Sequence, residues 1–176
     1  MTSTPLLGTA DDDREASIRV RVNGEQRVCF DGGKTLGDWL RNDLGLTATK
    51  LSCEQGLCGA CGVLVDGAIT GACSVLMCDI DGCDVITVEG LRDGARLHPV
   101  QQAFLQCRGF QCGYCTPGMV MSAVALLAES KQPSDDEIDS HFEGNLCRCT
   151  GYVAIRESVK HAAMLLQQER QGGGRA

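Results

Sequence analysis

Short runs of alternating apolar and polar residues dominate the first half of the chain, and this period of two predicts β-strands. Residues 18–22 alternate, Asn23-Gly24 follows, and residues 28–30 resume the alternation, which predicts a hairpin with a two-residue turn. A second hairpin is predicted around Asp66-Gly67, and a last strand is predicted over residues 85–88.

The same patterns predict which side chains face the core in the second strand of the first hairpin and in the helix that follows it. Val28 and Phe30 continue the apolar alternation of the first hairpin, which places Cys29 on the opposite face. Thr35 and Asp38 form a capping pair for a helix that follows. The buried face of this helix is predicted to carry Leu36, Trp39 and Leu40.

After Gly90 the apolar positions recur at the helical spacing of three and four residues. Pro99 suits the first turn of a helix, and Ser134 with Glu137 forms a capping box for a later one. The predicted helices run from Pro99 to Gly109, from Thr116 through Leu127, from Ser134 to near Gly144, and from about Tyr152 to Gln168. This half of the chain therefore predicts a small helical bundle.

Together the patterns predict an α+β fold in two units. Residues 17–91 combine the hairpins with one helix, and residues 92–170 are all helical. Residues 1–16 are expected to be a flexible leader, and residues 171–176 a disordered tail.

Charge and cysteine content narrow the class of protein. The formal charge of −7 argues against a nucleic-acid partner, which normally requires a basic surface. Twelve cysteines in 176 residues is the unusual count. Residues 1–15 lack the basic start, apolar core and cleavage site of a signal peptide, and no run reaches transmembrane length. We therefore expect a cytoplasmic protein, without membrane insertion, whose cysteines bind metal rather than form disulfides.

The first cysteine set consists of Cys53, Cys58, Cys61 and Cys73. The spacing Cys-x4-Cys-x2-Cys followed by a distant cysteine is typical of plant-type ferredoxins, which bind a [2Fe–2S] cluster. Three thiolates that converge from one short loop need a sharply bent backbone, which Gly56, Gly59 and Gly62 permit. These glycines also let backbone N–H groups approach the sulfurs. The four-residue gap disfavours zinc, because structural zinc sites usually contain two close cysteine pairs.

The second cysteine set consists of Cys112, Cys115, Cys147 and Cys149. Two close pairs also describe zinc sites, so the spacing alone leaves both zinc and a [2Fe–2S] cluster open. Each pair is predicted to lie at the start of a helix, where free N–H groups and the helix dipole favour a bound anion. An iron–sulfide core with four thiolates is such an anion, which favours the cluster.

Four cysteines have no ligand-like spacing and are predicted to be structural: Cys29, Cys78, Cys83 and Cys107. Cys107 in particular falls on the apolar stripe of its helix. His98, His141 and His161 are distant in sequence from the cysteine pairs, which argues against a Rieske-type centre with two histidines on one iron. No nucleophile–base pair or phosphate-binding loop stands out.

The segments around both cysteine sets resemble the iron–sulfur small subunit of the molybdenum hydroxylases, the xanthine oxidase family. The resemblance covers roughly residues 17–168. It rests on three segments, which are Cys53-Glu54-Gln55-Gly56-Leu57-Cys58-Gly59-Ala60-Cys61, Gln111-Cys112-Gly113-Tyr114-Cys115-Thr116-Pro117-Gly118 and Gly144-Asn145-Leu146-Cys147-Arg148-Cys149-Thr150-Gly151-Tyr152.

The resemblance implies a β-grasp, plant-type ferredoxin-like domain followed by an all-α four-helix-bundle domain, each with one [2Fe–2S] cluster. It also implies two partner chains, a large subunit with molybdopterin cytosine dinucleotide and a medium subunit with FAD, assembled as a dimer of heterotrimers. Electrons would pass from molybdenum through both clusters to FAD, and the isolated chain would catalyse nothing. By resemblance, Gln111 and Cys149 would contact the pterin, so the second cysteine set would hold the inner cluster and the first set the outer one.

Two other functions stay open on the sequence. One is a free-standing two-cluster electron carrier, and the other is a zinc-stabilised interaction module without a redox role. The substrate of a holoenzyme cannot be inferred from this chain, because the site that selects it would lie in a partner.

Overall fold

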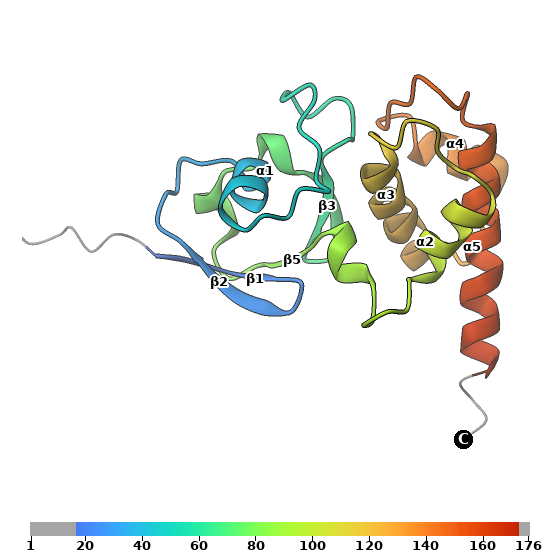
Figure 1. Ribbon diagram of the computed structural model, residues 1–176, viewed down its shortest axis with the longest axis horizontal. Helices are drawn as coiled ribbons and strands as arrows, with labels where there is room; N and C mark the ends of the chain where they lie inside the picture. Colours follow the sequence, from blue (N-terminus) through green and yellow to red (C-terminus); the bar gives the residue numbers. More distant parts are fainter. Residues whose placement is uncertain (1–16, 173–176) are drawn as a thin grey trace, which may run out of the picture.

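The computed structural model describes residues 17–172, which form a sheet-containing unit followed by a helical unit (Figure 1). The five strands of the sheet are β1 (Ile18–Val22), β2 (Glu25–Cys29), β3 (Gly62–Val65), β4 (Ala68–Gly71) and β5 (Asp84–Ile86). Their order is β2-β1-β5-β3-β4, with β1 and β5 parallel and the other neighbours antiparallel. The last strand is shorter than predicted, because a 3-10 turn begins at Val88.

Both predicted hairpins are present. Asn23 and Gly24 turn the first with φ of 51° and 85°, and Asp66 and Gly67 turn the second with φ of 48° and 84°. Two successive positive φ values suit the two-residue turn that matches the twist of paired strands. The Asn-Gly and Asp-Gly signals therefore located both turns correctly.

In β2, the outer strand of the first hairpin, the apolar side chains lie on the exposed face, although the alternation alone would suggest that they face the core. Cys29 lies opposite Ile18 in the register and is buried, whereas Val28 and Phe30 are 47% and 63% exposed. Residues opposite each other in an antiparallel pair share a face. The register therefore makes Cys29, and not its apolar neighbours, part of the core.

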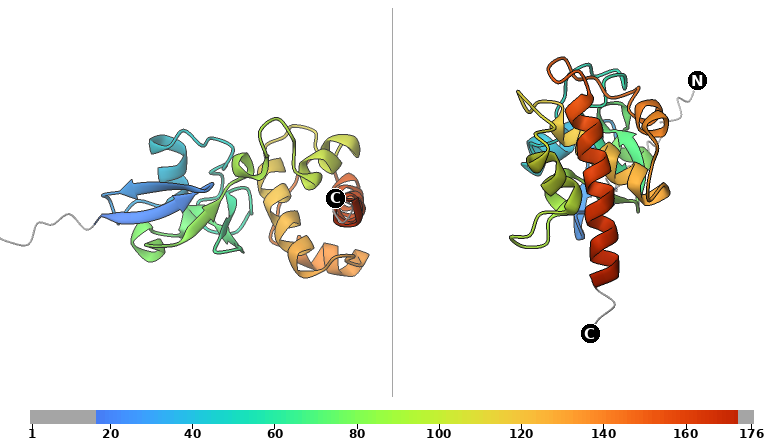
Figure 2. Two further views of the ribbon diagram at one scale, coloured as in Figure 1. Left: turned by 90° about the horizontal axis from the view of Figure 1, so that it is seen from below. Right: turned by 90° about the vertical axis from the view of Figure 1, so that its right-hand side faces the viewer.

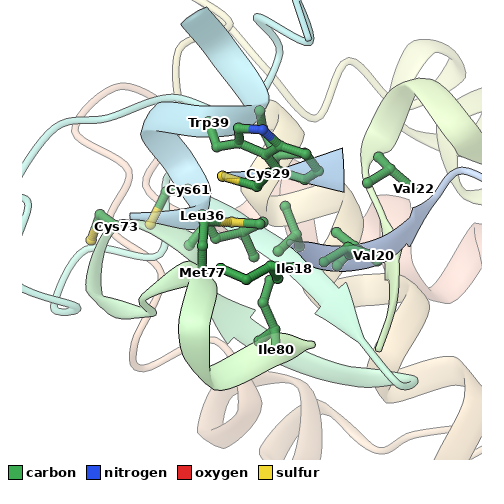
Figure 3. Packing of buried hydrophobic residues seen from close by; sticks show 14 residues of the cluster. Ile18, Val20, Val22, Cys29, Leu36, Trp39, Cys61, Cys73, Met77 and Ile80 are labelled. Atoms are coloured by element: carbon green, nitrogen blue, oxygen red, sulfur yellow. The ribbon is translucent and has the colours of Figure 1, made fainter. Parts of the chain in front are cut away.

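The predicted first helix is a single turn, α1 (Leu36–Asp38), continued by a π-helical turn over Trp39–Asp43. The Thr35 hydroxyl accepts a hydrogen bond from the Asp38 N–H, which is the predicted cap. Leu36, Trp39 and Leu40 are buried, as predicted. Trp39 and Leu36 pack in the core of the sheet unit, which also contains two cysteines of the first set, Cys61 and Cys73 (Figure 3).

The four predicted helices are also present, as α2 (Pro99–Gln106), α3 (Thr116–Glu129), α4 (Asp135–His141) and α5 (Val153–Gly172). The predicted capping box is present, with Ser134 and Glu137 bonded reciprocally at the start of α4. α5 lies on the side of the helical unit away from the sheet, and α3 lies between them (Figures 1 and 2). Leu64 of β3 packs with Met121 and Ala125 of α3, so the two units share a small apolar contact.

Some boundaries differ from the predicted ones. α2 ends at Gln106, and the left-handed residue after it is Arg108, with φ of 54°, rather than Gly109. Gly109 is needed for space, since a Cβ there would collide with Ser158. α5 begins at Val153 and continues to Gly172, so the first two residues of the expected tail are helical.

The expected leader, residues 1–16, and the end of the expected tail, residues 173–176, lie outside the described residues. Among residues 17–172, none of the helices has the length and apolar character that crossing a membrane requires.

Candidate metal centres

The loop before β3 carries three cysteines of the first set, and the 3-10 turn Ala72–Ser74 after β4 carries the fourth. Glu54, Gly56 and Gly59 have φ of 51°, 72° and 68°, so the loop bends as predicted. Gly62 is not left-handed, and a Cβ there would instead lie 3.2 Å from the Gly59 carbonyl oxygen. The loop thus uses Gly56 and Gly59 for conformation and Gly62 for close approach, and Gly59 also lies against Asn145.

The four sulfurs of the first set lie as two pairs. The Cys58 side chain helps to lower the pKa of Cys53, and the Cys73 side chain helps to raise the pKa of Cys61, so each thiol interacts with one partner of its set. Because β3 and β4 are a hairpin, Cys73 returns beside Cys61, which leads into β3. The pairing therefore follows from strand topology rather than from sequence separation.

Backbone N–H groups point at these sulfurs. Gln55 and Leu57 donate to Cys53 Sγ, each at 3.4 Å, and Gly56 donates to Cys73 Sγ at 3.4 Å. The two bonds from Gln55 and Leu57 lower the pKa of Cys53 to about 6. Burial raises the pKa of Cys61 to about 11. One member of the set thus ionises easily, whereas another is held neutral until a cation arrives.

The second set comes from two loops. Cys112 and Cys115 lie between α2 and α3, and Cys147 and Cys149 lie between α4 and α5. Cys115 is the N-cap of α3, as predicted, with Thr116 and Pro117 in the first turn. Cys149 is not at a helix start, because α5 begins four residues later, at Val153. The helix-dipole argument therefore applies to Cys115 and fails for Cys149.

These four sulfurs are also paired. Cys149 Sγ lies 3.6 Å from Cys112 Sγ, and the Cys147 thiol is within hydrogen-bonding reach of Cys115. The Tyr114 N–H lowers the pKa of Cys112, whereas the hydrogen bond with Cys112 raises the pKa of Cys149.

The two members of the Cys115–Cys147 pair differ in the same way. Burial raises the pKa of Cys115 to about 12. Burial also opposes ionisation of Cys147, but the hydroxyl and N–H of Thr150, together with the Cys149 N–H and the Cys115 thiol, outweigh it and lower the pKa. The hydroxyl lies 3.1 Å from Cys147 Sγ.

Both sets fit a cluster with two irons. Each iron of a [2Fe–2S] cluster takes two thiolates, so two pairs of sulfurs are the required arrangement, whereas one zinc ion needs four sulfurs around a single centre. Thr116 Oγ1, next to Cys115, is buried without a hydrogen-bond partner among the described residues, and a sulfide would supply an acceptor. In residues 17–172 no three histidine, cysteine or carboxylate side chains are placed to hold a single ion.

None of the remaining cysteines hydrogen-bonds to a thiol of either set within residues 17–172, although Cys29 shares the sheet core with Cys61 and Cys73. Cys29 is buried and donates to the Asp31 carbonyl at 3.4 Å, Cys83 packs partly against the sheet core, and Cys107 is the half-buried C-cap of α2. Cys78 is exposed, so a packing role does not fit it. The three histidines are engaged within the helical unit, His98 with the Val100 N–H, His141 with the Ser122 carbonyl and His161 with Gln106.

Several residues near the sulfurs were missed at the level of sequence. The Tyr152 hydroxyl accepts from the Cys147 N–H at 2.8 Å and donates to the Asn145 carbonyl at 2.9 Å. The Tyr114 hydroxyl donates to the Leu51 carbonyl at 2.7 Å. The Tyr114 contact had no signal in the spacing of the cysteines, because it joins two loops that are distant in sequence. The Tyr152 contacts are local, but they depend on the shape of the turn after Cys147, which cysteine spacing does not encode.

Comparison with known proteins decides the family. Residues 20–82 match the family described as 2Fe-2S iron-sulfur cluster binding domain, and residues 87–160 match the family described as [2Fe-2S] binding domain. The nicotine 6-hydroxylase small subunit of Paenarthrobacter nicotinovorans is 47% identical over 157 residues, which are 89% of this chain and 94% of that one. The nicotinate dehydrogenase small FeS subunit of Eubacterium barkeri is 43% identical over 83% of this chain and 94% of its own length. The chain belongs to the iron–sulfur small subunits of the molybdenum hydroxylases.

A solved structure agrees with this family. A chain of quinoline 2-oxidoreductase from Pseudomonas putida 86 matches with a TM-score of 0.82 and 41% identity, over 86% of this chain and 96% of that one. The expected fold class is therefore confirmed, with a β-grasp, ferredoxin-like [2Fe–2S] domain followed by a helical [2Fe–2S] domain. As a member of this family, the chain is an electron-transferring subunit of an oxidoreductase.

Proposed function

We propose that this subunit carries electrons from molybdopterin cytosine dinucleotide in a large partner subunit to FAD in a medium partner subunit. The observation that carries the proposal is the presence of two sets of four thiols, each of which divides into two pairs. When bound, each cluster accepts and gives up one electron at a time. The assembled enzyme is a dimer of heterotrimers in this proposal.

In this proposal the residues divide into an outer and an inner site. Residues 17–91 would hold the outer cluster, and residues 92–170 the inner cluster. The outer ligands would be Cys53, Cys58, Cys61 and Cys73. The inner ligands would be Cys112, Cys115, Cys147 and Cys149. The backbone N–H groups at Cys53 and Cys73 favour negative charge at the outer site, which supports its use as an electron acceptor.

The exposed edge of the second set supports contact with the pterin. Gln111 and Cys149 are both exposed, and Cys149 pairs with Cys112, the residue that follows Gln111. The Gln111 amide carries both donors and an acceptor, which suits the polar edge of a pterin. Gln111 and Cys149 would therefore position the pterin beside the inner site.

Purification of the tagged chain from its own host tests the assembly. We expect molybdenum, a cytosine dinucleotide form of molybdopterin and FAD to co-purify, with about four irons and about four acid-labile sulfides per chain. A tagged Cys78→Ser chain, altered at an exposed cysteine outside both sets, is the matched control and should retain the same composition. Elution as a single loaded chain would indicate a free-standing carrier, and stoichiometric zinc would contradict both functions.

A further inference from the structure

A single hydrogen bond connects the two cysteine sets along a short covalent path. The Leu146 N–H donates to the Cys58 carbonyl at 2.9 Å. Cys58 belongs to the first set, and Leu146 is the residue before Cys147 of the second. From Cys147 Sγ to Cys58 Sγ, every step is therefore a covalent bond except this one contact.

Close packing of backbone holds this contact in place. A Cβ at Gly118 of α3 would collide with the Gly59 carbonyl oxygen. A Cβ at Gly59 would collide with the Asn145 amide, and would lie 2.8 Å from the Gly144 carbonyl oxygen. The chain next to Cys58 thus fits between α3 and the segment that leads to Cys147, with no room for a side chain on either glycine.

Asn145 and Tyr152 brace the same segment from the helical side. The buried Asn145 side chain accepts a hydrogen bond from the buried Ser122 hydroxyl of α3 at 3.1 Å. The Tyr152 hydroxyl bonds to the Asn145 carbonyl and the Cys147 N–H, on either side of Leu146. The Leu146 side chain is itself exposed, so only its backbone takes part. Asn145 and Tyr152 therefore fix the position of the Leu146 N–H, and the Leu146 side chain is not needed for this contact.

A second hydrogen bond crosses between the loops but follows a longer path. The Tyr114 hydroxyl donates to the Leu51 carbonyl at 2.7 Å. Tyr114 lies two residues after Cys112, and Leu51 lies two residues before Cys53. Tyr114 also directly precedes Cys115, but this route passes through a whole tyrosine side chain and through Ser52, so it should couple the two sites more weakly.

We propose that electrons cross between the two sites through the Leu146 N–H···O=C Cys58 hydrogen bond, and that Asn145 is the residue that positions it. The proposal rests on the proposed function, since it assigns the route between the two clusters. One electron moves, the donor cluster is oxidised by one unit and the acceptor cluster is reduced by one, and no bond or proton changes place. Electron tunnelling weakens steeply across gaps, so one short hydrogen bond between covalent segments is the favoured crossing.

The test compares three variants of the full chain loaded with both clusters. Leu146→Pro removes the N–H, Leu146→Ala keeps it and removes only the exposed side chain, and Tyr114→Phe removes the other crossing bond. Flash photoreduction with freeze-quenched EPR measures how fast electrons redistribute between the clusters. We expect a several-fold slower redistribution in Leu146→Pro and the wild-type rate in both other variants. The magnetic splitting of the fully reduced chain reports whether the cluster separation has changed.

Unchanged splitting with an unchanged rate in Leu146→Pro overturns the proposal. If proline displaces the loop, Asn145→Ala decides, because it keeps the N–H and removes the amide that braces it. Hydrogen exchange at Leu146, followed by mass spectrometry, should then accelerate together with a slower transfer. Faster exchange with a wild-type transfer rate overturns the proposal. These measurements need no partner subunit, so failure to bind a molybdenum or flavin subunit would contradict the proposed function and leave this inference intact.

Discussion

Hydrogen bonding and burial act in opposite directions on the cysteines of each set, and the balance differs from one thiol to its partner. In the first set, N–H donors favour the thiolate of Cys53, whereas burial disfavours that of Cys61. Metal binding requires thiolates, so in the proposed outer site Cys53 would be the residue ready to capture the first iron, and binding at Cys61 would release a proton.

This difference predicts selective alkylation of the metal-free chain. With a pKa of about 6, Cys53 should react with iodoacetamide at a nearly constant rate above neutral pH, and more slowly as pH falls below 6. Cys61, with a pKa of about 11, should stay largely unmodified up to pH 8. Peptide mapping by mass spectrometry measures both sites in one sample. Equal labelling of the two cysteines at pH 7 would contradict the prediction.

Cysteines outside the two sets should be dispensable for iron. Cys29→Ala removes a buried sulfur and should lower the free energy of unfolding by about 1 kcal/mol, whereas exposed Cys78→Ala should change it by less than about 0.5 kcal/mol. Both variants should retain wild-type iron, sulfide and EPR signals, which chemical analysis and EPR will measure. Loss of either cluster in one of them would mean that the ligand sets are assigned incorrectly.

At the scale of elements, local signals were sufficient for the turns and caps. Asn23-Gly24, Thr35 and Ser134 act within a few residues of themselves, so their roles could be predicted from the sequence. The face of β2 could not, because it depends on the register with β1, which buries Cys29 opposite Ile18. Alternation in the sequence defines two faces and leaves open which of them meets the core.

The cap of α2 carries a pH dependence that can be measured. His98 Nδ1 accepts a hydrogen bond from the Val100 N–H at 3.3 Å, which only the neutral ring can do. Burial lowers the pKa of His98 below its ordinary 6.5, although Glu169 partly opposes the shift. The unfolded chain therefore binds the proton more readily, and stability is lost as pH falls from about 6.5 towards the folded pKa.

His98→Asn should keep the cap at every pH, since its amide oxygen does not titrate in this range. His98→Ala should cost about 1 kcal/mol at pH 8, where the wild-type cap is intact. Urea unfolding at pH 8 and pH 5 should therefore show a larger loss for the wild type than for His98→Asn. Equal losses in the two proteins would mean that His98 does not carry the dependence.

At the scale of the whole molecule, the two cysteine sets and their motifs were readable from the sequence, but their relation in space was not. The spacing of cysteines predicted eight candidate ligands, because ligand spacing is local. The approach of Gly59 to Gly118 and Asn145 brings together segments far apart in the chain, and no local pattern encodes it. Cys149 was misplaced for a different, local reason, since the left-handed Tyr152, with φ of 65°, delays the start of α5 to Val153.

The order of the two sites along the electron path gives the last prediction, which concerns the assembled enzyme. Cys58 is buried and belongs to the proposed outer set, whereas the proposed pterin contacts lie beside the inner set. Cys58→Ser should therefore damage the outer cluster alone. Substrate should still reduce the inner cluster quickly, because the path from the pterin to that site is untouched, but FAD should be reduced much more slowly.

Stopped-flow absorbance at cluster and flavin wavelengths, with EPR to count the remaining clusters, measures both steps in the Cys58→Ser enzyme. Cys78→Ser is the matched control, since it changes an exposed cysteine of the same domain outside both sets, and it should leave both steps at their wild-type rates. Wild-type flavin reduction in Cys58→Ser, with loss of the outer EPR signal established, would overturn the proposed order. Electrons would then reach FAD directly from the inner site, and the hydrogen bond between Leu146 and Cys58 would lie off the path of turnover.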